Sequence, residues 1–158
     1  MDLVELSQQE QKLLLELYCY EMDSAGQIIG NDELIQVLNI CPAELKLSFR
    51  KLALKGLLLG QSLTVRGKLF VEESGLLPVH RWSEVQAIRE AIAVAIVEAM
   101  VTDPNSDSIN LNDIVHRLPI KPGIIEFNLG VMAERGFITV QRGNCVGLGP
   151  RLRAMVGR

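Results

Sequence analysis

The sequence lacks several features that mark common functional classes. Its longest apolar run, Ala91 to Val101, is interrupted by Glu98 and is too short to cross a bilayer. Asp2 and Glu5 place acidic groups where a secretory signal peptide carries positive charge. There is also no glycine-rich phosphate loop and no GxSxG or HExxH motif. Because a catalytic site needs convergent reactive groups, we expect no enzyme activity, no cofactor and no membrane association.

Cysteine and histidine are scarce, with three and two residues respectively. Cys19, Cys41 and Cys145 are an odd number and do not have metal-ligand spacing. We therefore expect reduced thiols in a cytoplasmic protein. His80 and His116 are isolated from other ligand-type residues, so no metal site is expected.

The sequence does contain a match to itself. Residues 42–58 (PAELKLSFRKLALKGLL) align without a gap with residues 122–138 (PGIIEFNLGVMAERGFI), at a constant offset of 80 residues. A self-match at a fixed period indicates that one structural unit is used twice. We therefore predict two domains, residues 1–73 and 83–158, joined by a linker at residues 74–82 that contains glycine and proline.

The two matching segments are expected to be helices. Proline is favoured at the first helical position and glycine just after the last, which predicts helices over Pro42–Lys55 and Pro122–Arg135. Short strands should follow each helix as a hairpin. The predicted strands are Leu57–Leu59, Ser62–Arg66 and Leu69–Glu72 in the first half, and Phe137–Gln141 and Cys145–Leu148 in the second.

Capping boxes predict the first helix of each half. Ser7 with Glu10 begins a helix that runs to Met22, and Ser83 with Gln86 begins a longer one. Further elements complete the expected order of helix, short extended piece, helix, turn, helix and hairpin. These are an extended piece at Gln27–Gly30 and a helix at Asn31–Leu38 in the first half, and a strand at Ile109 and a helix at Asn112–Leu118 in the second.

This order resembles the winged-helix variety of helix-turn-helix domain. The expected fold class is mostly α with small β-hairpin wings, arranged as two winged-helix domains related by the 80-residue repeat. The residues that carry the resemblance are Asn31–Leu38, Pro42–Gly56 and the hairpin to Val71, with Asn112–Leu118, Pro122–Gly136 and the hairpin to Leu148. Winged helices occur in transcriptional regulators, replication initiators, condensin subunits of the ScpB type and sorting complexes. The resemblance therefore implies a fold without choosing one function.

Charge distribution favours a DNA-binding function for the first half. In the winged-helix family the third helix usually enters the major groove and the wing contacts phosphate. The net charge of the whole chain is −3, whereas DNA-binding proteins are usually basic. Residues 42–71, however, carry six basic residues against one acidic residue, a local net charge of +5. The candidate phosphate contacts are Lys46, Arg50, Lys51 and Lys55 on the helix and Arg66 and Lys68 on the wing, with Arg50 as the expected base reader. The alternative is a basic helix face that is simply solvated.

Apolar residues favour a different function. The helical period places Leu47 and Leu54 on the outer face of the first proline-initiated helix, and Gly123, Phe127 and Gly130 on the outer face of the second. An exposed apolar patch normally marks an interface. We therefore expect the second helix to pack against the first domain, a second copy of the chain or a partner protein.

Two hypotheses follow. The first is a tandem winged-helix transcription regulator that binds double-stranded DNA through its first unit. The alternative is a protein-interaction adaptor or scaffold subunit without nucleic acid, for which Leu47, Leu54 and Phe127 are the candidate contacts. A homodimer is compatible with both, because dimers commonly match two half-sites.

Overall fold

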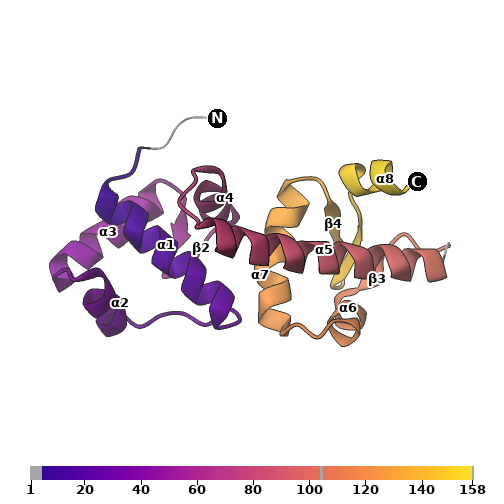
Figure 1. Ribbon diagram of the computed structural model, residues 1–158, viewed down its shortest axis with the longest axis horizontal. Helices are drawn as coiled ribbons and strands as arrows, with labels where there is room; N and C mark the ends of the chain where they lie inside the picture. The colour runs from indigo at the N-terminus through magenta and orange to yellow at the C-terminus, as the bar shows by residue number, and fades with distance from the viewer. Residues whose placement is uncertain (1–4, 104, 158) are drawn as a thin grey trace. The chain divides into compact units, whose positions relative to one another are not determined.

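The computed structural model describes residues 5–103 and 105–157, and the chain divides into two compact units, Met1–Pro78 and Val79–Arg158. The described part is mostly helical, with eight helices and two small antiparallel sheets (Figure 1).

The first unit contains α1 (Gln8–Asp23), α2 (Asn31–Leu38), α3 (Pro42–Leu54), β1 (Leu58–Leu59), β2 (Ser62–Leu63) and α4 (Val65–Glu73). The second contains α5 (Val79–Thr102), β3 (Ile109–Asn110), α6 (Leu111–Arg117), α7 (Pro122–Glu134), β4 (Ile138–Gln141), β5 (Cys145–Leu148) and α8 (Pro150–Val156).

Helix α1 is the centre of the first unit. The predicted capping box is confirmed: the Ser7 hydroxyl accepts the Glu10 backbone N–H at 3.1 Å, and the Glu10 carboxylate accepts the Ser7 N–H at 3.4 Å. Residues spaced three or four apart form one buried stripe that packs against α2, α3, α4 and β2. The buried apolar residues of this stripe are Leu13, Leu14, Leu17, Tyr18 and Met22.

The predicted helix that begins at Pro42 is confirmed. It ends at Leu54, and Gly56 follows in the left-handed conformation with φ of +77°. The Gly56 N–H donates to the Ala53 carbonyl and the Leu57 N–H donates to the Leu52 carbonyl, both at 3.0 Å. This is a Schellman cap, in which the left-handed residue at position 56 is usually glycine.

The predicted second wing strand at Leu69–Glu72 is wrong, because α4 occupies this segment. The Thr64 hydroxyl accepts the Gly67 N–H at 3.0 Å and donates to the Gly56 carbonyl at 2.7 Å, so Thr64 caps a new helix. A Cβ on Gly67 would lie only 2.2 Å from the Leu57 carbonyl oxygen, which shows how closely α4 approaches the preceding chain. The hairpin is therefore shorter than predicted.

The hairpin of the first unit consists of β1 and β2, which pair in antiparallel register, Leu58 with Leu63 and Leu59 with Ser62. The buried carboxylate of Glu21 on α1 holds β2 in place by accepting the Ser62 hydroxyl at 2.7 Å and the Leu63 N–H at 3.2 Å. The predicted extended piece at Gln27–Gly30 has no strand pairing.

The second unit packs α5, α6, α7 and α8 around a three-stranded sheet. The strand order is β3-β5-β4, and both pairs are antiparallel (Figure 1). The predicted start of α5 at Ser83 is wrong, because the helix begins at Val79. The Ser83 hydroxyl donates back to the Val79 carbonyl at 3.1 Å instead of capping. Proline is tolerated where a helix starts, so Pro78 fits this earlier beginning.

The core of the second unit lies between α5 and the sheet. Its members include Ile92 and Ile96 from α5, Ile125 from α7 and Val146 from β5, all at most 2% exposed. Helix α6 begins at Leu111, and the Asn110 side chain caps it by accepting the Asn112 N–H at 2.9 Å. The predicted strands at Phe137–Gln141 and Cys145–Leu148 are also confirmed, with β4 beginning one residue later, at Ile138.

Candidate nucleic-acid interface

The outer face of α3 carries three exposed cations. Lys46, Arg50 and Lys51 are all exposed. At about 100° per residue they lie on one side of the helix, with Leu47 and Leu54 between them. Leu47 is 51% exposed and Leu54 is 82% exposed, so their predicted outward position is confirmed. The face is thus an apolar stripe flanked by positive charge.

Within residues 5–103, no acidic group forms an ion pair with these three cations. The side chains of Lys46, Arg50 and Lys51 have no hydrogen bond or ion pair there. The one acidic residue on α3, Glu44, instead accepts hydrogen bonds from Gln9 at 3.4 Å and from Cys41 at 3.3 Å. The positive field of α3 is therefore directed to solvent.

The assignment of Arg66 and Lys68 to a wing is wrong, because both lie on α4. Arg66 is exposed, and its Nη1 atom would lie 3.6 Å from a Cβ placed on Gly56. Its guanidinium therefore lies beside the C-terminal end of α3 and can extend the basic face. Lys68 is half-buried and already engaged in an interaction, so it does not extend this face in the same way.

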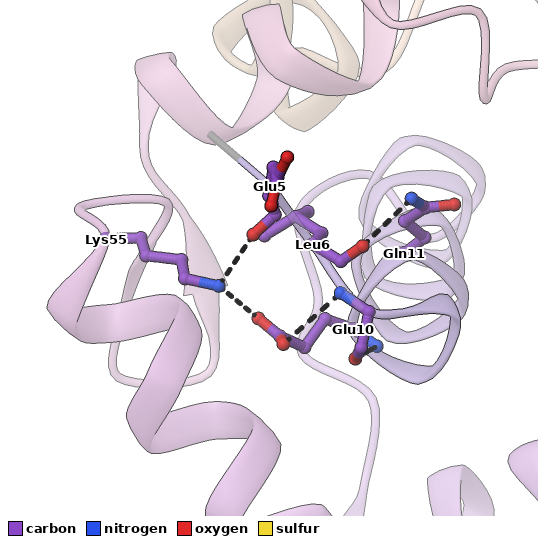
Figure 2. Close-up of polar contacts among 6 residues, drawn as sticks. Glu5, Leu6, Glu10, Gln11 and Lys55 are labelled. Atoms are coloured by element: carbon purple, nitrogen blue, oxygen red, sulfur yellow. Dashed lines mark hydrogen bonds and ion pairs between the residues drawn. The ribbon is translucent and has the colours of Figure 1, made fainter. Parts of the chain in front are cut away.

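Lys55 differs from the other candidate cations because it faces its own unit. Figure 2 shows its side chain reaching from the end of α3 towards the first turn of α1. The Lys55 ammonium donates to Glu10 Oε2 and to the Glu5 carbonyl, each at 2.9 Å (Figure 2). The Glu10 side chain is only 7% exposed. Lys55 therefore joins two helices, and the geometry gives it a structural role in place of the predicted phosphate contact.

The environment of Glu10 favours its charged form. Burial raises the pKa of the Glu10 carboxyl, but the hydrogen bonds from Lys55 and Ser7 and the Lys55 charge more than offset this effect. The pKa of Glu10 therefore lies below its ordinary value of 4.5. The sequence pattern identified Glu10 only as a capping residue, since its Lys55 partner lies 45 positions away.

Phe127, which the sequence places on the apolar outer face of this helix, is buried, with only 4% of its surface exposed. Helix α7 is apolar on nearly all sides, with Ile125, Leu129, Val131 and Met132 also buried, and a helix that is hydrophobic all round is a buried helix. The neighbouring candidates Gly123 and Gly130 are half-buried. The second unit therefore has no exposed apolar patch centred on Phe127.

The structure also contains a polar arrangement in the second unit that the sequence did not indicate. Asn128 on α7 is fully buried; its Oδ1 accepts Arg89 Nε at 2.9 Å, and its Nδ2 donates to the Ile124 carbonyl at 2.8 Å. The Arg89 guanidinium carbon lies 5.8 Å from the centre of the Trp82 ring. A single asparagine in an apolar helix could have indicated a buried hydrogen bond, but not its partner on α5.

No protein-family model matches the chain, and comparison with curated proteins and with solved structures also found no match. In the part of the chain that the structure describes, no three or more His, Cys, Asp or Glu side chains gather as a metal site. Across that same part, none of the helices combines the length and apolar character needed to span a membrane. The interpretation of function therefore depends on the three exposed cations of α3, Lys46, Arg50 and Lys51.

Proposed function

We propose that the chain is a tandem winged-helix protein whose first unit binds double-stranded DNA through α3. The order of elements supports the tandem fold, since a helix, a second helix, a proline-initiated helix and a hairpin follow one another in each unit. The two proline-initiated helices end at Gly56 and Gly136, with φ of +77° and +80°. The sequence match at an offset of 80 residues thus coincides with like backbone geometry at the end of each helix.

The observation that carries the DNA function is the exposure of Lys46, Arg50 and Lys51 on one face of α3, where none of them forms an ion pair with another described residue. Binding to DNA would be driven by neutralisation of phosphates and the release of their counterions. Arg50 lies near the middle of this face, where a guanidinium can donate two hydrogen bonds to guanine. Arg66 would add a phosphate contact at the end of α3. Leu47 and Leu54 offer apolar contact to thymine methyl groups only.

The second unit has a different role in this proposal. Glu126 and Glu134 are exposed on α7, and this helix carries no basic residue. A DNA-facing α7 would therefore repel phosphate. We assign DNA binding to the first unit alone, with a homodimer presenting two α3 helices to two half-sites. Transcriptional regulation in the cytoplasm, without catalysis or a cofactor, is the process that fits such a protein.

The proposal is tested by a charge-matched pair of triple variants. A fluorescently labelled duplex of mixed sequence is titrated with the wild-type protein at low salt. Simultaneous Lys46→Ala, Arg50→Ala and Lys51→Ala changes are expected to abolish binding. Simultaneous Lys12→Ala, Arg117→Ala and Lys121→Ala changes remove the same charge from exposed positions outside α3 and should leave most of the affinity intact. Equal losses in the two variants would contradict a specific site on α3.

A second function is favoured by one observation, the exposure of Leu47 and Leu54 on the same face. In this alternative the chain is an adaptor or scaffold subunit, and α3 contacts a protein. DNA binding and protein binding would both use the face of α3 that carries Leu47 and Leu54, so one chain cannot do both at the same time. A Leu47→Ser, Leu54→Ser double variant distinguishes them in sedimentation velocity and DNA titration. Loss of a dimer in the double variant, with no DNA binding by the wild type or the variant, would favour the protein interface.

A further inference from the structure

A groove of about 550 Å³ opens within the second unit. It is lined by the N-terminal half of α5, the end of α7, the residues leading into β4, and α8. Its volume is within the range of about 300–1,000 Å³ that is typical of small-molecule sites. The basic face of α3 lies in the other unit, so an occupant of this groove would be separate from the DNA function.

The walls of the groove are largely apolar. Met132 and Leu152 belong to the buried core of the unit and form part of the lining. Trp82 and Phe137 are half-buried and Met155 is 73% exposed, so they offer further apolar surface. A ligand with an apolar body would therefore be stabilised here by removal of its apolar surface from water.

The charged residues of the lining are mostly arginine. Arg89, Arg135 and Arg151 line the groove, against the one acidic lining residue of the described part, Glu90. The Arg151 guanidinium carbon lies 4.5 Å from the centre of the Phe137 ring, and Nη1 of Arg151 donates to the Arg135 carbonyl at 3.3 Å. The groove thus combines an apolar lining with an excess of positive charge.

Two of the guanidinium groups are held by neighbouring groups before any ligand arrives. Arg89 is fixed between the buried Asn128 amide and the Trp82 ring, and Arg151 lies over Phe137. Cations held in this way lose little conformational entropy when they bind an anion. A guanidinium also matches the two oxygens of a carboxylate with two parallel hydrogen bonds.

We propose that this groove binds a small amphipathic carboxylate, a monocarboxylic acid with an apolar tail. The tail lies against Trp82, Met132 and Leu152, and the carboxylate pairs with Arg151. A neutral apolar ligand fits less well, because it would take the Arg151 guanidinium out of water without supplying an anion. This inference does not rest on DNA binding by the first unit.

The single tryptophan of the chain provides the readout, because Trp82 lines the groove. Decanoate, kept well below its micellar concentration, is added while Trp82 emission is followed, with decanol as the uncharged control. Calorimetry measures the same binding independently. We expect a saturable change with decanoate and binding at least tenfold weaker with decanol. Absence of both a saturable emission change and a heat of binding would overturn the proposal, as would equal affinity for the two ligands.

Two variants locate the carboxylate. Arg151→Gln should weaken decanoate binding about tenfold or more, whereas Arg142→Gln, at an exposed turn outside the groove, should not change it. Met155→Glu adds negative charge at an exposed position of the lining and should also weaken binding without disturbing the core. Circular dichroism confirms that each variant is folded. Wild-type affinity in the Met155→Glu protein, or in a folded Arg151→Gln protein, would overturn this placement.

Discussion

Lys55 Nζ lies 2.9 Å from Glu10 Oε2, and this ion pair joins the end of α3 to the first turn of α1. The two residues are 45 positions apart, so the contact belongs to the tertiary structure of the first unit. It separates Lys55 from Lys46, Arg50 and Lys51, whose side chains are exposed on the same helix. Lys55 therefore supports the fold, whereas Lys46, Arg50 and Lys51 are exposed to solvent.

Replacing Lys55 is expected to destabilise the protein. Lys55→Met would leave the Glu10 carboxylate, which is 7% exposed, without its cationic partner. Leaving a buried charged acceptor without a partner costs about 1–3 kcal/mol. Urea unfolding followed by circular dichroism measures the change. Lys51→Met is the matched control on the same helix and should change the free energy of unfolding by less than about 0.5 kcal/mol. Equal effects would contradict the structural role of Lys55.

Stability should depend on pH through Glu10. Because its pKa in the folded protein lies below the ordinary value of 4.5, Glu10 contributes stability that is fully present above pH 4.5. This contribution is lost as the pH falls through the folded-state pKa. The difference in unfolding free energy between the wild type and Glu10→Gln should therefore be larger at pH 7 than in strongly acidic solution. A difference that does not change with pH would show that the carboxylate charge is not involved.

Gly67 is expected to tolerate no side chain. A Cβ there would lie 2.2 Å from the Leu57 carbonyl oxygen, which is backbone and cannot rotate away. Gly67→Ala should lower the free energy of unfolding, since such overpacking costs about 1–3 kcal/mol and outweighs any gain in helix propensity. Gly30→Ser is a suitable control, because a Cβ at Gly30 meets nothing within 4 Å and serine is a preferred N-cap residue. Thermal unfolding of both variants checks this difference; a stable Gly67→Ala protein would argue against the close packing of α4.

The buried amide of Asn128 should stabilise the second unit. Asn128→Ala removes the acceptor of Arg89 Nε and leaves a small cavity in α7, with an expected loss of about 1–3 kcal/mol. Asn112→Ala, on the exposed surface of α6, serves as the control and should be close to neutral. Chemical unfolding monitored by Trp82 fluorescence follows both proteins. An unchanged midpoint for Asn128→Ala would contradict this role.

The elements that could be predicted from the sequence are those with local signals. Ser7 and Glu10 specify the start of α1 within one helical turn, and Pro42 and Gly56 specify both ends of α3. The turn at residues 142–144 separates two short strands in the same local way. In each case the hydrogen bonds or backbone conformations that determine the element lie within a few residues of the sequence motif that predicts it.

The errors arose where distant contacts decide the outcome. Residues 69–72 have strand-like character, but the cap at Thr64 and the packing of Val71 into the core favour a helix. Helical periodicity predicted the helix that ends beside Lys55. It could not predict the ion pair between Lys55 and Glu10, because Glu10 lies on a different helix.

The most direct test of DNA binding by α3 is the salt dependence of affinity. The slope of log K against log salt reports the number of phosphates neutralised, at about 0.9 for each contact on duplex DNA. Simultaneous Lys46→Ala, Arg50→Ala and Lys51→Ala changes should make the slope shallower by about two to three wherever binding remains measurable. The Lys12, Arg117 and Lys121 triple alanine variant should retain the wild-type slope. A wild-type protein that fails to bind duplex DNA at low salt, or equal slopes for wild type and the α3 variant, would contradict the account.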